Sequence, residues 1–138
     1  NKKHLLHHER TDKYKYKIIH TPKQTYYSSI KHKYQNKPKI FISLTDTYDV
    51  IVDKKNNMGM TQSVAFIITQ SVNQSYTFQK ILLHPLYVFL NNICRYGNFN
   101  NVRILQKFPY VDNDTIDIYS YFNLTNDERA HIIKFTSN

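Results

Sequence analysis

The sequence predicts an α+β domain, in which a small antiparallel or mixed sheet from the N-terminal half packs against C-terminal helices. Up to about residue 69, apolar residues alternate with polar ones or form short runs, as in strands; from about residue 75 they recur three and four positions apart, as in helices. A chain of 138 residues, 41% of them hydrophobic, has the size of one domain with a modest core. We therefore expect a basic tail or linker over residues 1–12 and a single domain over residues 13–138.

Four stretches of the first half are predicted to be strands, because their apolar residues alternate or run together between turn-forming residues. They are KYKYKIIHT (13–21), KPKIFISL (37–44), YDVIVD (48–53) and SVAFIIT (63–69). Residues 45–47 favour a hairpin turn, and the polar segment 54–59 is predicted to be a loop. SVAFIIT is the most apolar of the four, so we expect it to be the central strand.

Helical spacing begins with Phe78, Ile81 and Leu82, which predicts a helix over residues 75–83. Pro85 suits the first turn of a second helix, since proline lacks only an N–H that the first turn does not use. The apolar residues of this second helix keep the same spacing: Leu86, Phe89, Leu90 and Ile93. A glycine at position 97 is expected to end it.

The C-terminal part carries further helix signals. A short helix is predicted over residues 101–107. Thr125 followed by Glu128 is a capping-box pattern, in which each side chain accepts a hydrogen bond from the other residue's backbone N–H. This pattern predicts a final helix with Ile132 and Ile133 facing inward.

The positive charge is concentrated at the N-terminal end. Residues 1–39 contain eleven lysines and arginines and two acidic residues, so they carry the whole formal net charge of +9; residues 40–138 contain eight of each sign. The same N-terminal segment contains five of the seven histidines and five of the twelve tyrosines. A basic segment with interleaved aromatic residues is typical of a surface that binds a polyanion, nucleic acid first. A solvated surface that only keeps the protein soluble is the alternative.

Several catalytic motifs are missing from the sequence. Its two glycines, Gly59 and Gly97, are too far apart to form a glycine-rich phosphate loop. Neither glutamate begins a nuclease-type Glu-x-Lys motif. None of the four prolines belongs to the Asn/Asp-Pro-Pro-aromatic motif with which adenine N6-methyltransferases hold the target amine. We therefore expect no catalytic residue, cofactor or metal in this chain, and leave open whether a parent protein is an enzyme.

Two clusters have a spacing that a metal site would use. They are His4, His7 and His8, and Asp46, Asp49 and Asp53. A flexible basic tail is favoured for the histidines, and roles in turns and at strand ends are favoured for the aspartates. Cys94, the single cysteine, is expected to be a small buried thiol. A lone cysteine and the absence of a long apolar run favour an intracellular protein without a membrane segment.

Six segments occur in a recognisable order. They are DKYKYKIIHT (12–21), NKPKIFISL (36–44), YDVIVD (48–53), MGMTQS (58–63), HPLYVFLNNICRYGNFNNVRILQKFPYVD (84–112) and DIYSYFNLTNDERAHI (117–132). Together they resemble the C-terminal target-recognition region of adenine-specific (N6) DNA methyltransferases of type II restriction-modification systems, including relatives in large DNA viruses. The resemblance extends over about residues 12–133. This chain departs from the family's Gly-Phe-Asn-Asn elbow by one additional residue, Asn98.

The resemblance implies a DNA-binding target-recognition module that is not catalytic alone, with double-stranded DNA and a methyltransferase domain or larger assembly as partners. We expect the basic segment to contact backbone phosphates and the elbow to contact bases, because Asn pairs with adenine and Arg with guanine. The predicted nucleic-acid-binding residues are Lys13, Tyr14, Lys15, Lys17, Lys23, Lys31, Lys33, Asn100, Asn101 and Arg103. For the elbow asparagines, capping and turning the chain is an equally weighted alternative.

Two other functions remain open. One is a repurposed viral or accessory structural subunit that binds nucleic acid or protein through the basic N-terminal face. The other is an RNA-binding domain, because basic and aromatic strands also suit single-stranded RNA. The expected location is the bacterial cytoplasm, a virus-infected cell or a virion.

Overall fold

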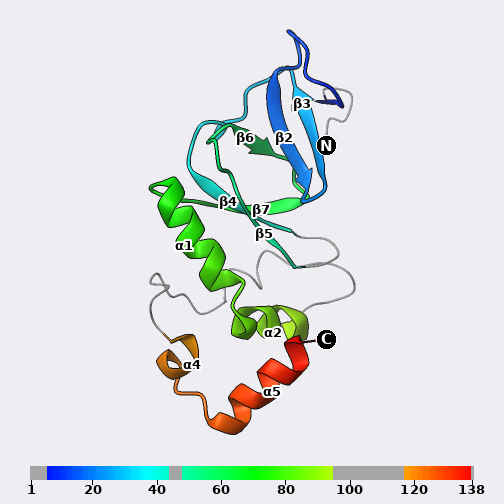
Figure 1. The fold of residues 1–138 in the computed structure, drawn as a ribbon. Helices are drawn as coiled ribbons and strands as arrows, with labels where there is room; N and C mark the ends of the chain where they lie inside the picture. The colour runs from blue at the N-terminus through cyan, green and yellow to red at the C-terminus, as the bar shows by residue number, and fades with distance from the viewer. Residues whose placement is uncertain (1–5, 44–47, 95–116, 138) are drawn as a thin grey trace.

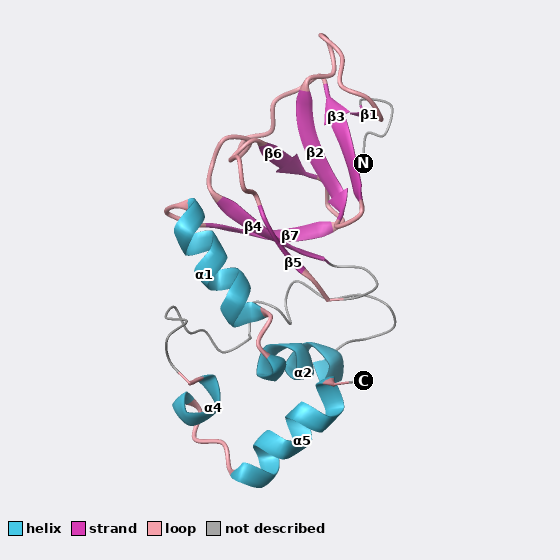
Figure 2. Cartoon of the chain, viewed as in Figure 1, coloured by secondary structure: helices cyan, strands magenta, loops and turns pink. Residues whose placement is uncertain are grey.

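The computed structural model describes residues 6–43, 48–94 and 117–137. Two small sheets from the N-terminal half lie beside each other, and the helix of residues 72–82 runs from the second sheet to a group of C-terminal helices (Figures 1 and 2). The α+β class and the packing of sheet against helices are confirmed. The predicted turn at residues 45–47, the helix over residues 101–107 and the helix end at Gly97 lie outside the described residues.

The first sheet is mixed, with the strand order β1-β3-β2-β6. Its strands are β1 (Leu6–His7), β2 (Tyr16–Thr21), β3 (Gln24–Ser28) and β6 (Met58–Met60). β2 and β3 form an antiparallel hairpin, and β2 is parallel to β6. β1 pairs with β3 at the outer edge, within the segment expected to be a tail. β6 is only three residues long and begins within the segment 54–59 that was expected to be a loop.

The second sheet is antiparallel, with the order β5-β4-β7. Its strands are β4 (Lys39–Ser43), β5 (Val50–Val52) and β7 (Val64–Ile68). The prediction that residues 63–69 form the central strand is wrong, because β7 lies at an edge and exposes Phe66 and Ile68. β4 is central and buried along its whole length. Because its first residue, Lys39, is charged, the sequence does not show that the whole strand is buried.

Four helices follow the sheets in the described residues. They are α1 (Val72–Leu82), α2 (Pro85–Cys94), α4 (Ile118–Tyr121) and α5 (Asn126–Thr136). Two predicted helix starts are confirmed: the Thr125–Glu128 capping box is present at α5, and Pro85 is the first residue of α2. The inward face of α5 was predicted only in part, because Ile132 is buried but Ile133 is 48% exposed.

Three clusters of buried side chains hold these layers together. Between the two sheets lie Ile19, Phe41, Met60 and Val64. Between the second sheet and α1 lie Ile40, Ile42, Tyr48, Val50, Val52 and Phe78. Among the helices lie Ile81, Leu86, Tyr87, Ile118 and Ile132. The Tyr48 hydroxyl also donates to the Leu82 carbonyl at 2.8 Å, which joins the second sheet to the end of α1.

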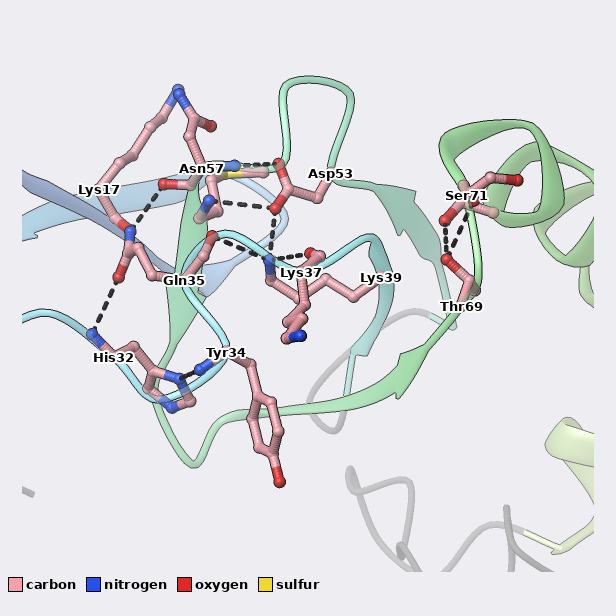
Figure 3. A network of polar contacts seen from close by, with 12 residues as sticks. Lys17, His32, Tyr34, Gln35, Lys37, Lys39, Asp53, Asn57, Thr69 and Ser71 are labelled. Atoms are coloured by element: carbon pink, nitrogen blue, oxygen red, sulfur yellow. Dashed lines mark hydrogen bonds and ion pairs between the residues drawn. The ribbon is translucent and has the colours of Figure 1, made fainter.

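A buried ion pair joins the central strand to the end of β5. Lys39 Nζ lies 2.6 Å from Asp53 Oδ2, and neither side chain is exposed (Figure 3). The ammonium group also donates to the carbonyls of Gln35 and Lys37, at 3.2 and 2.7 Å. Its three N–H donors are therefore all used. Burial lowers the pKa of Lys39, and the hydrogen bond and charge of Asp53 act against that change.

The Asp53 carboxylate holds the following turn. Its two oxygens accept hydrogen bonds from the backbone N–H groups of Asn57 and Met58, at 3.2 and 3.1 Å. These bonds place β6 directly after the turn. The carboxylate thus acts at a strand end and in a turn, the role that the sequence favoured over metal binding.

Gln35 connects this ion pair to the first sheet. Its Nε2 donates to the carbonyls of Lys17 and Asn57, at 2.8 and 2.7 Å, and its Oε1 accepts from the His32 N–H at 3.1 Å (Figure 3). Gln35 is only 3% exposed. The connection between β3 and β4 is therefore fixed to β2 and to the chain entering β6 by one side chain.

Replacing Lys39 with methionine should lower the free energy of unfolding by about 3–5 kcal/mol, because Asp53 would remain buried without its counter-charge. Urea denaturation followed by circular dichroism measures this change. Lys37→Met is the matched control, since the Lys37 side chain is exposed, and it should change stability by less than about 0.5 kcal/mol. A loss of under about 1 kcal/mol for Lys39→Met would contradict the role assigned to the pair.

Replacing Gly59 with alanine should also destabilise the fold, by about 1–3 kcal/mol, because there is no room for a methyl group. An added Cβ would lie 2.6 Å from His32 Cβ, 2.8 Å from Ile18 Cδ1 and 2.9 Å from Gln35 Oε1. Thermal unfolding checks this, with Lys54→Ala in the nearby exposed turn as control. An unchanged midpoint would show that the connection between β3 and β4 can move away from β6.

Candidate nucleic-acid interface

Two of the predicted lysines lie in the segment that leads into β2. Lys13 and Lys15 are exposed, and each Nζ lies 5.5 Å from the ring centroid of the tyrosine that follows it, Tyr14 or Tyr16. His7 of β1 stacks on Tyr14 at 5.1 Å between centroids, which holds the segment against the sheet. Exposed cation–π contacts contribute about 0.5–1 kcal/mol. They orient the ammonium groups but leave them in water.

Two more lysines lie on the connection between β3 and β4. Lys31 and Lys33 are exposed, and Lys33 Nζ lies 5.3 Å from the centroid of the Tyr34 ring. Ser28 at the end of β3 pairs with Tyr16 at the start of β2, so this connection leaves the sheet at the end where the first segment enters. The basic end, as we call this group, consists of Lys13, Lys15, Lys31 and Lys33.

The other two predicted lysines lie apart from the basic end. Lys23 is exposed in the turn between β2 and β3, and the six residues of β2 at about 3.3 Å each place it about 20 Å away. Lys17 is half-buried within β2, opposite Tyr27. The six lysines therefore form one group of four and two separate positions.

Acidic side chains are scarce around the basic end. In the described residues that precede β4, the carboxylates are those of Glu9 and Asp12, and both are exposed. Arg10 adds an exposed positive charge in the same segment. Lys39, which the sequence counts with the basic segment, does not contribute to this surface, because Asp53 pairs with it in the interior.

The interface also includes residues that the sequence did not single out. The tyrosines Tyr16 and Tyr34 lie beside ammonium groups just as Tyr14 does. The signal for them is a Lys-Tyr pair that occurs three times in the basic segment. Gln35 supports this surface from the interior. No local pattern marks it, because its Nε2 bonds to Lys17 and Asn57, 18 and 22 residues away.

His32 sets the shape of the connection that carries Lys31 and Lys33. Its Nδ1 accepts a hydrogen bond from the Tyr34 N–H at 3.0 Å (Figure 3). Burial lowers the pKa of His32, and the charge of Lys39 lowers it further. An imidazole whose Nδ1 accepts a hydrogen bond must be neutral, so the lowered pKa and the contact agree.

His84 makes the same contact between α1 and α2. Its Nδ1 accepts from the Leu86 N–H at 3.1 Å, and its ring packs edge-on against Tyr119 with 4.7 Å between centroids. Burial lowers the pKa of His84, although the nearby charge of Asp117 opposes the change. Two separate parts of the fold thus depend on a neutral histidine.

The remaining predicted site residues are not placed. Asn100, Asn101 and Arg103 lie outside the described residues, so their contact with bases stays a prediction. Across residues 6–43, 48–94 and 117–137, no three His, Cys, Asp or Glu side chains are grouped as a metal site would need. In the same ranges, every helix is too short or too polar to cross a bilayer.

Comparisons with models of protein families, with curated proteins and with solved structures gave no match. The resemblance to methyltransferase target-recognition regions therefore stays a prediction that depends on the order of the sequence motifs.

The free energy of unfolding should fall as the pH falls below about 6.5, the ordinary pKa of histidine. Folding lowers the pKa of His32 and His84, so between the lowered values and 6.5 the unfolded chain binds more protons than the folded one. The stabilisation is complete above 6.5 and is lost towards the lowered values. Urea denaturation at a series of pH values from about 5 to 8 measures it.

The double variant His32→Asn and His84→Asn separates this effect from general acid sensitivity. Asparagine can accept the same hydrogen bond from the N–H two residues ahead but does not titrate. The variant should show a flatter pH dependence, whereas His8→Asn, at an exposed position, should leave it unchanged. Equal slopes in all three proteins would contradict the assignment.

Proposed function

We propose that this chain is a non-catalytic module that binds double-stranded DNA through the basic end. The observation that carries the proposal is the gathering of four exposed lysines at one end of a hairpin, three of them beside tyrosine rings. When exposed lysines contact phosphates, they displace the counterions condensed on the nucleic acid. This release supplies essentially all of the non-specific affinity. The proposal is also supported by the backbone that carries Lys31 and Lys33. The Lys39–Asp53 ion pair and Gln35 hold this connection between β3 and β4 in place.

In this proposal, the elbow around residues 97–103 recognises the base sequence of the DNA. That part rests on the resemblance to target-recognition regions of adenine-specific methyltransferases, in which a separate domain carries the chemistry. Adenine methylation or restriction would then be the activity of a larger protein or assembly inside a cell or a virus. The basic end would hold the duplex in register, since phosphate contacts position a protein but do not specify sequence.

The affinity for duplex DNA should depend steeply on salt. If the four lysines and Arg10 each contact a phosphate, the logarithm of the binding constant should fall against the logarithm of salt concentration with a slope of about −4 to −5. Fluorescence anisotropy with a labelled duplex at several salt concentrations measures this slope. A slope near zero would exclude the basic end as a phosphate-binding surface.

A pair of triple variants tests the location of the interface. Replacing Lys13, Lys15 and Lys33 with alanine should make the slope shallower by about 3. The control removes the same charge from exposed lysines elsewhere, with Lys54, Lys55 and Lys134 changed to alanine, and should keep the original slope. If both triple variants changed the slope equally, the DNA would be attracted by the net charge of the protein and not by the basic end.

Competition with other polyanions tests the class of partner. Unlabelled duplex DNA should displace the labelled duplex at lower concentrations than single-stranded RNA of the same length. Preferential displacement by RNA would favour an RNA-binding domain instead. Absence of binding to either nucleic acid would favour a structural subunit whose basic end contacts protein.

A further inference from the structure

Within residues 6–43, 48–94 and 117–137, the strand β7 has one edge without a partner strand. Thr69 donates its N–H to the Pro38 carbonyl at 2.9 Å, which fixes the phase of the hydrogen bonds between β4 and β7. Hydrogen-bonded pairs alternate along an antiparallel ladder, so Ile67 and Ala65 also bond to β4. Phe66 and Ile68 then direct their N–H and C=O groups away from the sheet. No other described residue forms a hydrogen bond with these outward groups.

The opposite edge of the same sheet is blocked at Val50, its first residue. On β5, the Val50 N–H donates to Asp49 Oδ1 at 2.8 Å, and the Val50 carbonyl accepts from Gln79 Nε2 of α1 at 2.9 Å. Side chains therefore satisfy both outward backbone groups of Val50. An open strand edge is a template for another strand, and proteins usually block one that they do not use. Among the described residues, no side chain blocks Phe66 or Ile68 of β7 in this way.

Apolar side chains line the open edge. Phe66 and Ile68 are each 38% exposed on the face that bears Lys39 and Phe41. The Tyr34 ring lies against Phe66 with 5.3 Å between centroids. This contact places the connection between β3 and β4 beside the edge. An added strand would meet backbone groups along the edge and an aromatic and aliphatic surface beside it.

The charge beside the open edge has one sign. The two segments next to it, residues 29–43 and 61–71, contain no acidic residue. Lys31, Lys33 and Lys37 are exposed in the first of them, and the Pro38 contact with Thr69 brings the end of that segment to β7. An acidic strand would therefore be attracted to this edge and a basic one repelled.

We propose that the β7 edge is a strand-addition site for an extended, acidic segment of a partner protein. The alternation of outward N–H and C=O groups selects a peptide backbone, which supplies matching acceptors and donors. A phosphate backbone supplies acceptors only, so this site is separate from the DNA-binding proposal. A second copy of this chain does not suit the edge, because self-pairing would bring two sets of lysines together.

The probe for this site is a peptide of about eight residues with alternating glutamate and valine, long enough to pair with the five residues of β7. Amide hydrogen exchange followed by NMR reports on each strand residue separately. Without peptide, the N–H groups of Phe66 and Ile68 should exchange fast and those of Ala65 and Ile67 slowly. With peptide, Phe66 and Ile68 should become protected while Ala65 and Ile67 remain so.

A proline variant tests whether the backbone edge carries the binding. Ile68→Pro removes an outward N–H but none that bonds to β4, so the sheet should persist, and binding should weaken at least about tenfold, which corresponds to about 1.4 kcal/mol. Ile68→Ala is the matched control for the lost side chain and should stay within about threefold. A peptide with lysine in place of glutamate should not bind.

Three results would overturn the proposal. They are unchanged exchange of Phe66 and Ile68 at saturating peptide, equal affinity for the glutamate and lysine peptides, and unchanged affinity in Ile68→Pro. The exchange experiment uses the natural chain, so it decides even if the proline variant does not fold. Replacing Lys13 and Lys15 with alanine should leave peptide binding intact, so that failure of DNA binding and of strand addition can be told apart. Protection that grows with protein concentration without peptide would assign the edge to self-association and contradict the acidic partner.

Discussion

The ion pair of Lys39 and Asp53 is the interaction on which the other parts of the N-terminal half depend. Removing two charges from water is costly, and the pair persists only because each partner is fully hydrogen-bonded. The ammonium group binds the connection between β3 and β4 through two carbonyls, and the carboxylate binds the turn before β6 through two N–H groups. One contact therefore sets the positions of two of the three segments that join the two sheets, the one between β3 and β4 and the one between β5 and β6.

The lysines of this protein divide into two roles according to their distance from that pair. Lys39 is buried and paired with Asp53, and it binds backbone carbonyls. The lysines of the basic end are exposed, and three of the four lie beside tyrosine rings. The connection between β3 and β4 contains both kinds within a few residues. Its inner side is fixed by Gln35 and the ion pair, so its outer side can present Lys31 and Lys33 in a constant arrangement. The same connection contacts β7 through Tyr34 and Phe66, so the two proposed binding surfaces share this segment.

Local signals in the sequence predicted the elements whose stabilising contacts are local. The capping box at Thr125 and Glu128 and the start of α2 at Pro85 depend only on neighbouring residues, and both were found. The strand order was not predictable in this way. β7 is more apolar than β4, yet β4 is central because it has a sheet on one face, α1 on the other and a strand at each edge.

The candidate site shows the same division. The sequence showed that lysines and tyrosines are frequent in residues 1–39, but not which of them lie close together. That depends on the register of the hairpin, which places Lys31 and Lys33 near the segment before β2 and Lys23 at the opposite end. Lys39 read as a surface charge because its partner, Asp53, is 14 residues away. A buried charge is recognisable only when its counter-charge is found, and a single sequence does not indicate which aspartate that is.

The parallel pairing of β2 with β6 has a consequence for the order in which the protein is assembled. Residues that face each other there, such as His20 and Thr61, are 41 positions apart, and the whole of β4 and β5 lies between them. Closing so long a loop has an entropic cost that the contacts of β4 and β5 reduce once they form. During synthesis, the first sheet cannot be completed until the ribosome has released the chain beyond Met60. The segments that carry the basic end are made before β6, and their sheet is completed only after β6 is available.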